Sequence, residues 1–455
     1  MIDFKKFEKY SRPGPRYTSY PTAPEFSEQF TQEDLKQYYK KQSDDRPLSL
    51  YTHLPFCRSA CYFCGCNVIF TSKEDKKVRY IEYLKKELDL LKEALNTNRE
   101  VTQMHFGGGT PTYFSPEQLN TVISMIKNTF PNFSDDAEIS CEVDPRYFTK
   151  EHMDVLKAQG FTRLSFGVQD LNEDVQKTIH RIQPYETTQN VMKIARDAGI
   201  KSINIDLIYG LPHQNKETFH ETIEQIIKLN PDRLAVFNYA HVPWLMKTMR
   251  KFDESTFAHP TEKLEILKDT IDFFTNNGYK MVGMDHFAKP EDELFKAIEK
   301  GELHRNFQGY TTKGGADLIG IGVTSIGNGV DYYAQNYKDL KHYEQALDEG
   351  KLPTFKGYKL SFDDMLRQYV IMELMSNFSL NIKRVEEKFN INFYDYFKED
   401  LKSLDEFIQA DLLSINNDKI EVSTTGAMLI RNICMPFDAY LKKVPENKRR
   451  FSKTI

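Results

Sequence analysis

The chain has 455 residues, of which 40% are hydrophobic and 28% are charged, with a formal net charge of −5. This composition can bury a large core and excludes a disordered acidic or basic chain. The negative charge argues against nucleic acid or an anionic membrane as a partner, although it allows local basic pockets. No apolar run approaches the roughly 18 residues that span a bilayer, and the N-terminus lacks a signal-peptide core. We therefore expect a soluble, cytoplasmic protein that binds neither nucleic acid nor a membrane.

Residues 1–47 are rich in proline and tyrosine and predict an N-terminal arm. Four prolines interrupt the stretch SRPGPRYTSYPTAPEF. Because proline removes a backbone donor and clashes with the preceding helical turn, this stretch cannot form a regular helix. We expect it to be extended and to wrap around another part of the molecule.

Residues 48–355 alternate between short β-type runs and amphipathic helical stretches. The β-type runs are 48–54, 101–107, 138–144, 163–169, 202–210, 233–239 and 279–285, and the helical stretches are Lys77–Leu91, Ser115–Ile126, Lys150–Gln159, Lys216–Leu229 and Glu262–Phe274. This alternation indicates βαβ units and a parallel sheet. Six or seven such units predict an α/β fold, a partial (β/α) barrel. Functional residues are then expected just after each strand.

Residues 356–455 have a different pattern and predict a separate, mostly helical C-terminal domain. The segments 361–375, 382–389 and 393–408 look helical, and KIEVST at 419–424 looks like a short strand of a hairpin or wing. A winged helix often binds DNA, but the acidity of the chain favours a structural role or a lid over the barrel mouth.

Cysteine clusters directly after the first predicted strand. Four of the six cysteines lie within ten residues there: Cys57, Cys61, Cys64 and Cys66. In a long chain of a reducing compartment, such thiols more often bind a metal or perform redox chemistry than form disulfides. The C-x3-C-x2-C spacing lets three thiolates face one point, and three ligands would leave one iron of a four-iron cube open. A zinc site with Cys66 as fourth ligand is the alternative. The isolated Cys141 and Cys434 are expected in the core.

Glycines and carboxylates end the next predicted strands. Three glycines at 107–109 let the backbone approach a ligand closely, with N–H groups free to bind a carboxylate. The third strand ends with Glu142 and Asp144, of which Asp144 suits a helix N-cap better. Asp206 lies among isoleucine and leucine in the fifth run. Because a buried unpaired carboxylate is costly, we expect Asp206 to face the barrel lumen.

The motif CRSACYFCGC resembles the cluster motif of the radical S-adenosylmethionine (SAM) superfamily. This resemblance implies that Cys57, Cys61 and Cys64 bind a [4Fe–4S] cluster and that Cys66 does not. In that superfamily SAM chelates the open iron, and one electron cleaves it to methionine and a 5′-deoxyadenosyl radical.

The stretch PGPRYTSYP, paired with the cluster motif, resembles the N-terminal arm of the oxygen-independent coproporphyrinogen III oxidase (coproporphyrinogen dehydrogenase) family. The resemblance continues in YTHLPFCRSACYFCGCN, HFGGGTPT, FGVQD, HRIQP, NIDLIYGLP, NFQGYTT and GIGVTSIGNG. It implies decarboxylation of two propionates of coproporphyrinogen III to vinyl groups, which gives protoporphyrinogen IX in haem biosynthesis, with an unidentified electron donor. Such a C–H bond has no acidic proton, so side-chain acid–base catalysis cannot break it and a cofactor radical is needed.

The same resemblance implies two SAM molecules. It gives Tyr51, Gly108, Glu142 and Ile326 for the cluster-bound SAM, and Phe63, Gly109, Thr110, Gln169, Arg181, Asp206 and Ala240 for the second. A planar guanidinium such as that of Arg181 can clamp a carboxylate in bidentate fashion. For Ile326 and Ala240 the residue types alone indicate only apolar positions near strand ends, where simple packing explains them equally well.

The family's substrate carries four propionates, so an acidic chain must build a local positive site for it. Arg16 in the arm is the main candidate, with ordinary surface charge as the alternative. Tyr17 and Tyr20 could stack on pyrrole rings. Gln308, in the segment NFQGYTT, is a further candidate.

Other functions are weighed against this one. A haem chaperone of the same superfamily shares the cluster motif but lacks the PGPRYTSYP arm in this form. A radical SAM methyltransferase would usually need another nucleophilic cysteine or a cobalamin-binding segment, and neither stands out. A zinc-dependent binding module would be colourless when made without oxygen. We further expect a monomer.

Overall fold

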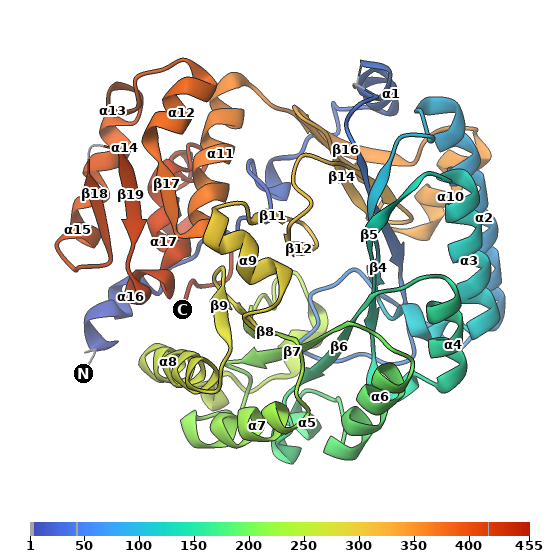
Figure 1. Cartoon of the computed structure of the whole chain (residues 1–455), viewed down its shortest axis with the longest axis horizontal. Helices are drawn as coiled ribbons and strands as arrows, with labels where there is room; N and C mark the ends of the chain where they lie inside the picture. The colour runs from blue at the N-terminus through green and yellow to red at the C-terminus, as the bar shows by residue number, and fades with distance from the viewer. Residues whose placement is uncertain (1–3, 42–43, 417) are drawn as a thin grey trace.

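The computed structural model describes residues 4–41, 44–416 and 418–455. A large curved sheet with helices along its outer face holds most of the chain, and a smaller, mostly helical part lies beside it (Figure 1). Within the described residues, no helix has both the length and the apolar character needed to cross a membrane.

The sheet has twelve strands, and its centre is parallel. In spatial order the seven parallel strands are β13 (Asp317–Ile321), β1 (Leu48–Leu54), β4 (Val101–Gly108), β5 (Phe133–Val143), β6 (Arg163–Gln169), β7 (Ser202–Tyr209) and β8 (Arg233–Asn238). Antiparallel strands extend both edges: β14 (Ile326–Asn328), β15 (Tyr332–Asn336) and β16 (Thr354–Lys359) beyond β13, and β10 (His286–Ala288) and β9 (Lys280–Val282) beyond β8. The order is linear, so the described sheet is an open, partial barrel.

Six of the seven predicted strands are confirmed as β1 and β4–β8, whereas the seventh run holds only a three-residue strand that is not parallel. Residues 279–285 contain β9 and a turn, and β9 pairs with β10 in antiparallel fashion. Gly283 in that turn has φ +57°, a conformation that glycine adopts without strain. The remaining parallel strand is β13, which pairs with β1.

Amphipathic helices cover the outer face of the sheet (Figure 1). They are α2 (Glu74–Ala94), α3 (Pro116–Thr129), α4 (Lys150–Ala158), α5 (Glu173–Thr178), α6 (Tyr185–Asp197), α7 (Lys216–Lys228), α8 (Pro260–Asn276) and α10 (Leu340–Asp348). The five predicted helical stretches are confirmed as α2, α3, α4, α7 and α8. Their apolar faces and the sheet enclose one core, in which Leu50, Phe106 and Leu164 are fully buried.

The C-terminal part has its own core and a small sheet. Its elements are α11 (Phe362–Asn377), α12 (Ile382–Phe389), α13 (Phe393–Tyr396), α14 (Lys398–Lys402), α15 (Asp405–Ile408), α16 (Thr424–Ala427) and α17 (Ile430–Cys434), with strands β17 (Ser379–Asn381), β18 (Leu413–Asn416) and β19 (Lys419–Val422). The predicted helices and the KIEVST strand are present. β16 belongs to the large sheet and ends at Lys359, so the predicted boundary after residue 355 falls inside a strand.

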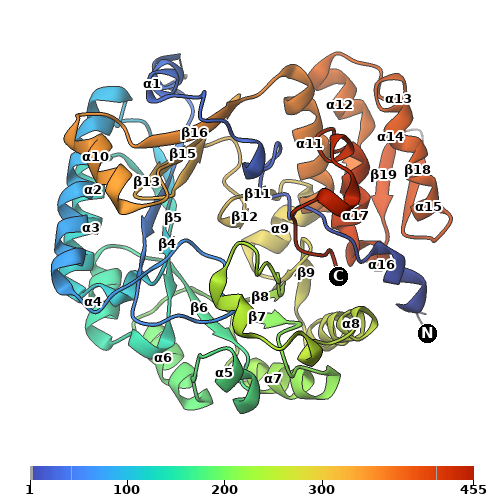
Figure 2. The same cartoon turned by 180° about the vertical axis from the view of Figure 1, so that it is seen from behind.

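The N-terminal arm runs into the C-terminal part instead of lying on the barrel alone. Tyr10, Tyr17 and Tyr20 belong to the core of the C-terminal part. Pro13 forms a β-bridge with Lys453, so the arm runs beside the last residues of the C-terminal part (Figure 2). The arm is extended around its prolines as predicted, but it also contains α1 (Gln32–Lys41).

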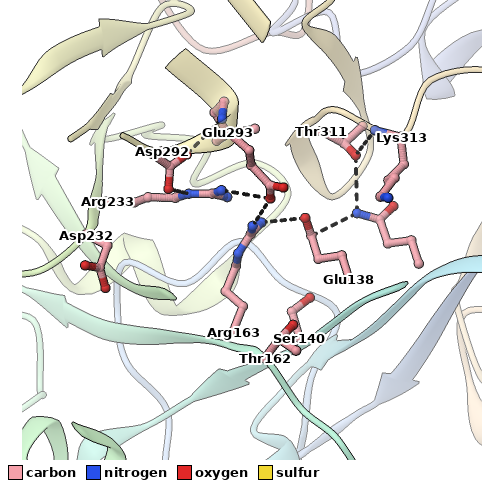
Figure 3. Close-up of polar contacts among 12 residues, drawn as sticks. Glu138, Ser140, Thr162, Arg163, Asp232, Arg233, Asp292, Glu293, Thr311 and Lys313 are labelled. Atoms are coloured by element: carbon pink, nitrogen blue, oxygen red, sulfur yellow. Dashed lines mark hydrogen bonds and ion pairs between the residues drawn. The ribbon is translucent and has the colours of Figure 1, made fainter. Parts of the chain in front are cut away.

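Charged side chains close the amino end of the lumen. Arg163 at the start of β6 pairs with Glu138 of β5 at 2.8 Å (Nη1–Oε2) and with Glu293 at 2.5 Å (Nη2–Oε1). Arg233 at the start of β8 pairs with Asp292 at 2.7 Å (Nε–Oδ2) and also with Glu293, as Figure 3 shows. Asp292 caps helix α9 (Glu293–Lys300) and Glu293 is its first residue. These pairs therefore fix α9 across the lumen floor, and the hairpin of β11 (His304–Asn306) and β12 (Gly309–Thr311) follows it.

Candidate active site

The cysteine loop leaves β1 and lies over the carboxyl ends of the parallel strands. Cys57 ends the short strand β2 (Phe56–Cys57), which pairs with β3 (Ile69–Phe70) on the far side of the loop. One pocket is lined by all four clustered cysteines and by predicted SAM residues: Phe63, Gly108, Gly109, Thr110, Glu142, Gln169, Arg181 and Asp206. Residues from the ends of β4, β5, β6 and β7 thus meet the cysteine loop at one place.

The three thiols predicted to bind iron have polar neighbours. Cys57 Sγ lies 3.3 Å from Thr110 Oγ1, and Cys61 Sγ accepts hydrogen bonds from Arg146 Nη2 at 3.6 Å and Arg181 Nη1 at 3.7 Å. A hydrogen bond from the Cys66 thiol lowers the pKa of Cys64 to about 7. A cube-shaped cluster takes each thiolate on a different iron, and cationic donors stabilise its sulfur ligands. The donor set of this pocket fits such a cluster.

Glycine is required where β4 meets the cysteine loop. Gly109 N donates to Leu54 O at 2.9 Å, and Thr110 N donates to Phe56 O at 3.0 Å. A Cβ atom on Gly109 would lie 2.6 Å from Pro55 O, so no side chain fits there. The backbone of residues 108–110 consequently forms one wall of the pocket.

Alternation along the strands puts polar residues in the lumen in layers. Because side chains of a strand alternate between its faces, Glu138, Ser140 and Glu142 of β5 share one face, as do Asn204 and Asp206 of β7. All five line the lumen cavity. Asp206 therefore faces the lumen, as expected, in the layer nearest the cysteines, where Glu142 lies with it.

The two carboxylates of that layer have different surroundings. Asp206 accepts hydrogen bonds from Ser165 Oγ at 3.0 Å and Asn204 Nδ2 at 2.7 Å. Burial, and then the charge of Glu142, raise the pKa of Asp206 to about 6. Glu142 accepts a bond from Gly108 N at 3.3 Å, and its side chain is 48% exposed.

Gln169 and Arg181 occupy the same side of the pocket. Gln169 has φ +74°, which is unusual for a residue with a side chain, and its buried Oε1 lacks a partner among the described residues. Such strain and an unsatisfied polar atom are typical of ligand sites. Arg181 Nη1 donates to Asp144 Oδ2 at 3.0 Å and its Nη2 donates to Gly167 O at 2.5 Å. Asp144 also accepts a hydrogen bond from Arg146 N at 3.1 Å, so Asp144 is the helix N-cap that was predicted.

Three predicted SAM residues lie outside the set that lines this pocket. Tyr51 is in β1, where its hydroxyl lies 3.1 Å from His53 Nδ1 and its ring stacks on His105. Ile326 begins β14, and Ala240 follows β8. Ile326 and Ala240 therefore lie at strand ends and Tyr51 in the middle of β1, outside the described lining of the pocket.

The predicted substrate residues separate into two groups. Arg16 reaches the end of β8, where its Nη2 donates to Asn238 O. Gln308 lines the lumen cavity, and neither its Nε2 nor its Oε1 has a partner among the described residues. Tyr17 and Tyr20 are buried in the C-terminal core; the Tyr17 hydroxyl donates to Asp438 Oδ2 at 3.0 Å and the Tyr20 hydroxyl accepts from Ala439 N at 3.0 Å. Their burial favours a structural role over stacking on a pyrrole.

Several polar residues of the pocket escaped the sequence analysis. Arg146, Ser165 and Asn204 all contact predicted site residues. Asn204 could have been found from strand alternation, because it lies two residues before Asp206 on the same face of β7, and Ser165 lies beside it on the neighbouring strand β6. Arg146 follows Asp144-Pro145 and gave no pattern of its own.

Comparisons with known proteins agree with this geometry. The Radical SAM superfamily model matches residues 51–226, and the HemN C-terminal domain model matches residues 360–429. The oxygen-independent coproporphyrinogen III oxidase of Helicobacter pylori (strain J99) is 60% identical over 100% of this chain and 99% of its own length. That of Escherichia coli (strain K12) is 46% identical over 100% and 98%.

The chain belongs to the oxygen-independent coproporphyrinogen III oxidase family. A solved structure described as coproporphyrinogen III oxidase (HemN) from Escherichia coli, a radical SAM enzyme, superposes with a TM-score of 0.91 at 44% identity and covers 97% of this chain and 99% of that one. The predicted radical SAM fold is thereby confirmed. Membership of the radical SAM superfamily implies a [4Fe–4S] cluster and SAM as cofactors.

Proposed function

We propose that this chain catalyses the oxygen-independent oxidative decarboxylation of coproporphyrinogen III to protoporphyrinogen IX, a step of haem biosynthesis. The observation that carries the proposal is the pocket in which the cysteine loop meets Glu142 and Asp206 at the mouth of the lumen. Full-length identity of 60% to a relative with that name supports the substrate. When bound, the cluster and SAM supply a radical able to remove hydrogen from an unactivated C–H bond.

Different residues of the pocket are proposed to bind the cluster and each SAM molecule. Cys57, Cys61 and Cys64 would hold the cluster. The backbone of residues 108–110 offers N–H groups and close approach, which suits the amino-acid end of SAM. Tyr51, Gly108, Glu142 and Ile326 are assigned to the cluster-bound SAM. A second SAM is proposed at Phe63, Gly109, Thr110, Gln169, Arg181, Asp206 and Ala240, supported by the unpartnered Gln169 oxygen in the same pocket.

The substrate is proposed to enter between the barrel mouth, the arm and the C-terminal part. Arg16 and Gln308 reach this region from different segments, and both present groups suited to carboxylates. We further propose an arm of residues 1–47, a catalytic domain of 48–355 and a C-terminal domain of 356–455. A cytoplasmic monomer that takes its electrons from a separate donor completes the proposal.

An anaerobic assay with coproporphyrinogen III, SAM and a strong reductant tests this function. We expect protoporphyrin, detected after oxidation, together with 5′-deoxyadenosine. Deoxyadenosine without protoporphyrin would contradict the substrate, and the absence of both from protein with a four-iron cluster would favour a haem chaperone. Cys61→Ser should lose iron and activity together; a variant with full iron content and turnover would contradict its assignment.

A further inference from the structure

A group of guanidiniums lies between the arm, the barrel mouth and the C-terminal part, outside the cysteine pocket. Arg305 comes from β11, Arg16 from the arm and Arg431 from α17. Asp285, just before β10, lies within electrostatic reach of all three. One carboxylate therefore lies among three positive charges, of which the Arg305 and Arg431 side chains are buried and Arg16 is half-buried.

Arg305 is the least satisfied member of this group. Its side chain is 5% exposed, and its Nη1 lies 4.0 Å from Asp285 Oδ1, beyond hydrogen-bond distance. Neither Nε nor Nη1 has a hydrogen-bond partner among the described residues. Asp285 Oδ1 is already bonded to His286 Nδ1 at 2.7 Å. Nε and Nη1, which lie on different edges of the guanidinium, thus lack an acceptor, so each edge offers one free donor.

The surroundings of Arg305 hold it in place without using those donors. Its guanidinium lies 4.7 Å from the centre of the Tyr310 ring, on the facing strand of the hairpin. The Tyr310 hydroxyl accepts from Met284 N at 2.9 Å and donates to Met375 O at 3.2 Å, so the ring itself is fixed. A cation–π contact stabilises the charge but does not replace hydrogen bonds to a buried guanidinium.

The other two arginines differ in how they are bonded. Arg431 donates to Gly14 O and to Pro15 O and Lys453 O, the last two at 2.9 and 3.2 Å, and so ties down backbone. Arg16 donates one hydrogen bond, from Nη2 to Asn238 O, among the described residues. Arg16 and Arg305 are therefore the two members free to bind an anion.

The hairpin that carries Arg305 lines the lumen cavity, which adjoins the cysteine pocket. Gln308 and Tyr310, which follow Arg305 in the hairpin, line that cavity together with Glu142 and Asp206, and the last two also line the cysteine pocket. A ligand in this cavity hence lies beside the proposed SAM sites at one end and against the hairpin that carries Arg305 at the other.

We propose that Arg305 and Arg16 form a carboxylate-binding site for a propionate side chain that the reaction leaves intact, an inference that rests on the proposed function. The planar fork of a guanidinium matches a carboxylate with two parallel hydrogen bonds, which a lysine cannot make. The site orients the tetrapyrrole by a group remote from the reacting carbon.

The test compares two probes on the reconstituted full chain. Coproporphyrin III carries four carboxylates, and its tetramethyl ester carries none. Arg305→Met should weaken binding of coproporphyrin III by about tenfold or more, since a bidentate charged pair is lost, and leave binding of the ester unchanged. Arg305→Lys should weaken coproporphyrin III binding less. Arg79→Met, which removes an exposed arginine of α2 paired with Glu344, should change neither.

Either of two results would overturn the site. One is coproporphyrin III binding to Arg305→Met as tightly as to the unmodified chain. The other is equal weakening of both probes, which a purely structural role predicts. If Arg305→Met does not fold, Arg305→Lys tests the site instead. It should weaken binding of coproporphyrin III and leave binding of the tetramethyl ester unchanged.

Turnover separates this inference from the proposed function. Suppose that the unmodified chain makes no protoporphyrin but that Arg305→Met selectively loses coproporphyrin III binding. This result would refute the function and retain the anion site. Normal turnover with an unchanged KM in Arg305→Met would refute the site and retain the function.

Discussion

Glu142 and Asp206 face one cavity, but only one of them is poised to respond to a charged ligand. Glu142 is half exposed, whereas burial raises the pKa of Asp206 to about 6. An opposite charge nearby favours the ionised form of a carboxyl group. A cationic sulfonium in this pocket would therefore bind more tightly as Asp206 ionises. Without such a ligand, the buried ionised carboxylate lowers the free energy of unfolding.

Asp206→Asn should stabilise the ligand-free protein at neutral pH and weaken the function of the proposed second SAM, with iron content unchanged. The pKa is raised from its usual value near 4 to about 6, so the carboxyl group contributes stability below about pH 4 and loses it as pH rises through 6. We expect a gain of about 2 kcal/mol at about pH 8 and a smaller gain at about pH 5. Urea unfolding at both pH values measures this.

The exposed Asp197 of α6, which pairs with Lys193, provides the control. Asp197→Asn should change stability by less than about 0.5 kcal/mol at either pH. An equal gain at both pH values in Asp206→Asn, or loss of iron from it, would show that Asp206 is simply structural.

Gly109→Ala tests the contact between β4 and the cysteine loop. The new Cβ would meet Pro55 O at 2.6 Å and Phe56 O at 2.8 Å, and backbone atoms cannot turn aside. We expect a loss of about 2 kcal/mol in stability together with weaker iron binding. Gly65→Ala, in the cysteine loop itself but with open space around its Cβ, should retain stability; similar losses in both would contradict the steric argument.

Local patterns were enough to predict the cysteines, the glycines and the lumen-facing Asp206. Each follows from spacing or from strand alternation over a few residues. Tyr17 and Tyr20 could not be placed in this way, because their partners Asp438 and Ala439 lie some 420 residues later in the chain. Arg305 was missed for the same reason, since its significance comes from acceptors that are lacking in the folded state.

The strands show a similar division between local and distant causes. Apolar runs predicted β1 and β4–β8, because parallel strands buried on both faces have continuous hydrophobic sequences. β13 is only five residues long, and its partner β1 lies far away in the sequence. The local sequence pattern therefore did not predict it. The predicted run 279–285 joined β9 to the turn that follows it, because Gly283, where the chain turns, stands inside an apolar stretch.

Buried charge pairs hold helix α9 in place, so a substitution of Arg233 tests how the helix is anchored. Arg233→Met leaves Asp292 buried without its partner, and breaking such a pair costs about 3 kcal/mol or more. We expect this destabilisation together with faster proteolysis between residues 289 and 313, because the hairpin that carries Arg305 follows α9. Denaturant unfolding and limited proteolysis measure the two effects.

A second substitution and a surface variant make that prediction specific. Asp292→Asn retains the α9 cap while removing the charge, so adding it to Arg233→Met should restore part of the stability. Lys193→Met removes an exposed pair and should cost less than about 0.5 kcal/mol. If the double variant recovers no stability, the loss in Arg233→Met comes from the missing packing of the arginine side chain and not from the unpaired charge.

The arm joins the two ends of the molecule into one unit. Its tyrosines complete the core of the C-terminal part, while Arg16, between them in sequence, reaches back to the end of β8. Arg431 supports this connection by donating to Gly14 O and Pro15 O. The C-terminal part therefore has a direct means of placing an arm residue at the barrel mouth, beyond covering that mouth.

Releasing the arm should impair substrate binding without affecting the cluster. Arg431→Met leaves the Gly14 and Pro15 carbonyls unpaired, and local opening should speed trypsin cleavage after Arg16 by about tenfold or more. KM for coproporphyrinogen III should rise, while iron content and SAM cleavage without substrate stay unchanged. Arg449→Met is the matched control, because Arg449 donates to Leu441 O and Val444 O within the C-terminal part. If both variants are cleaved at the rate of the unmodified chain, the buried tyrosines alone hold the arm.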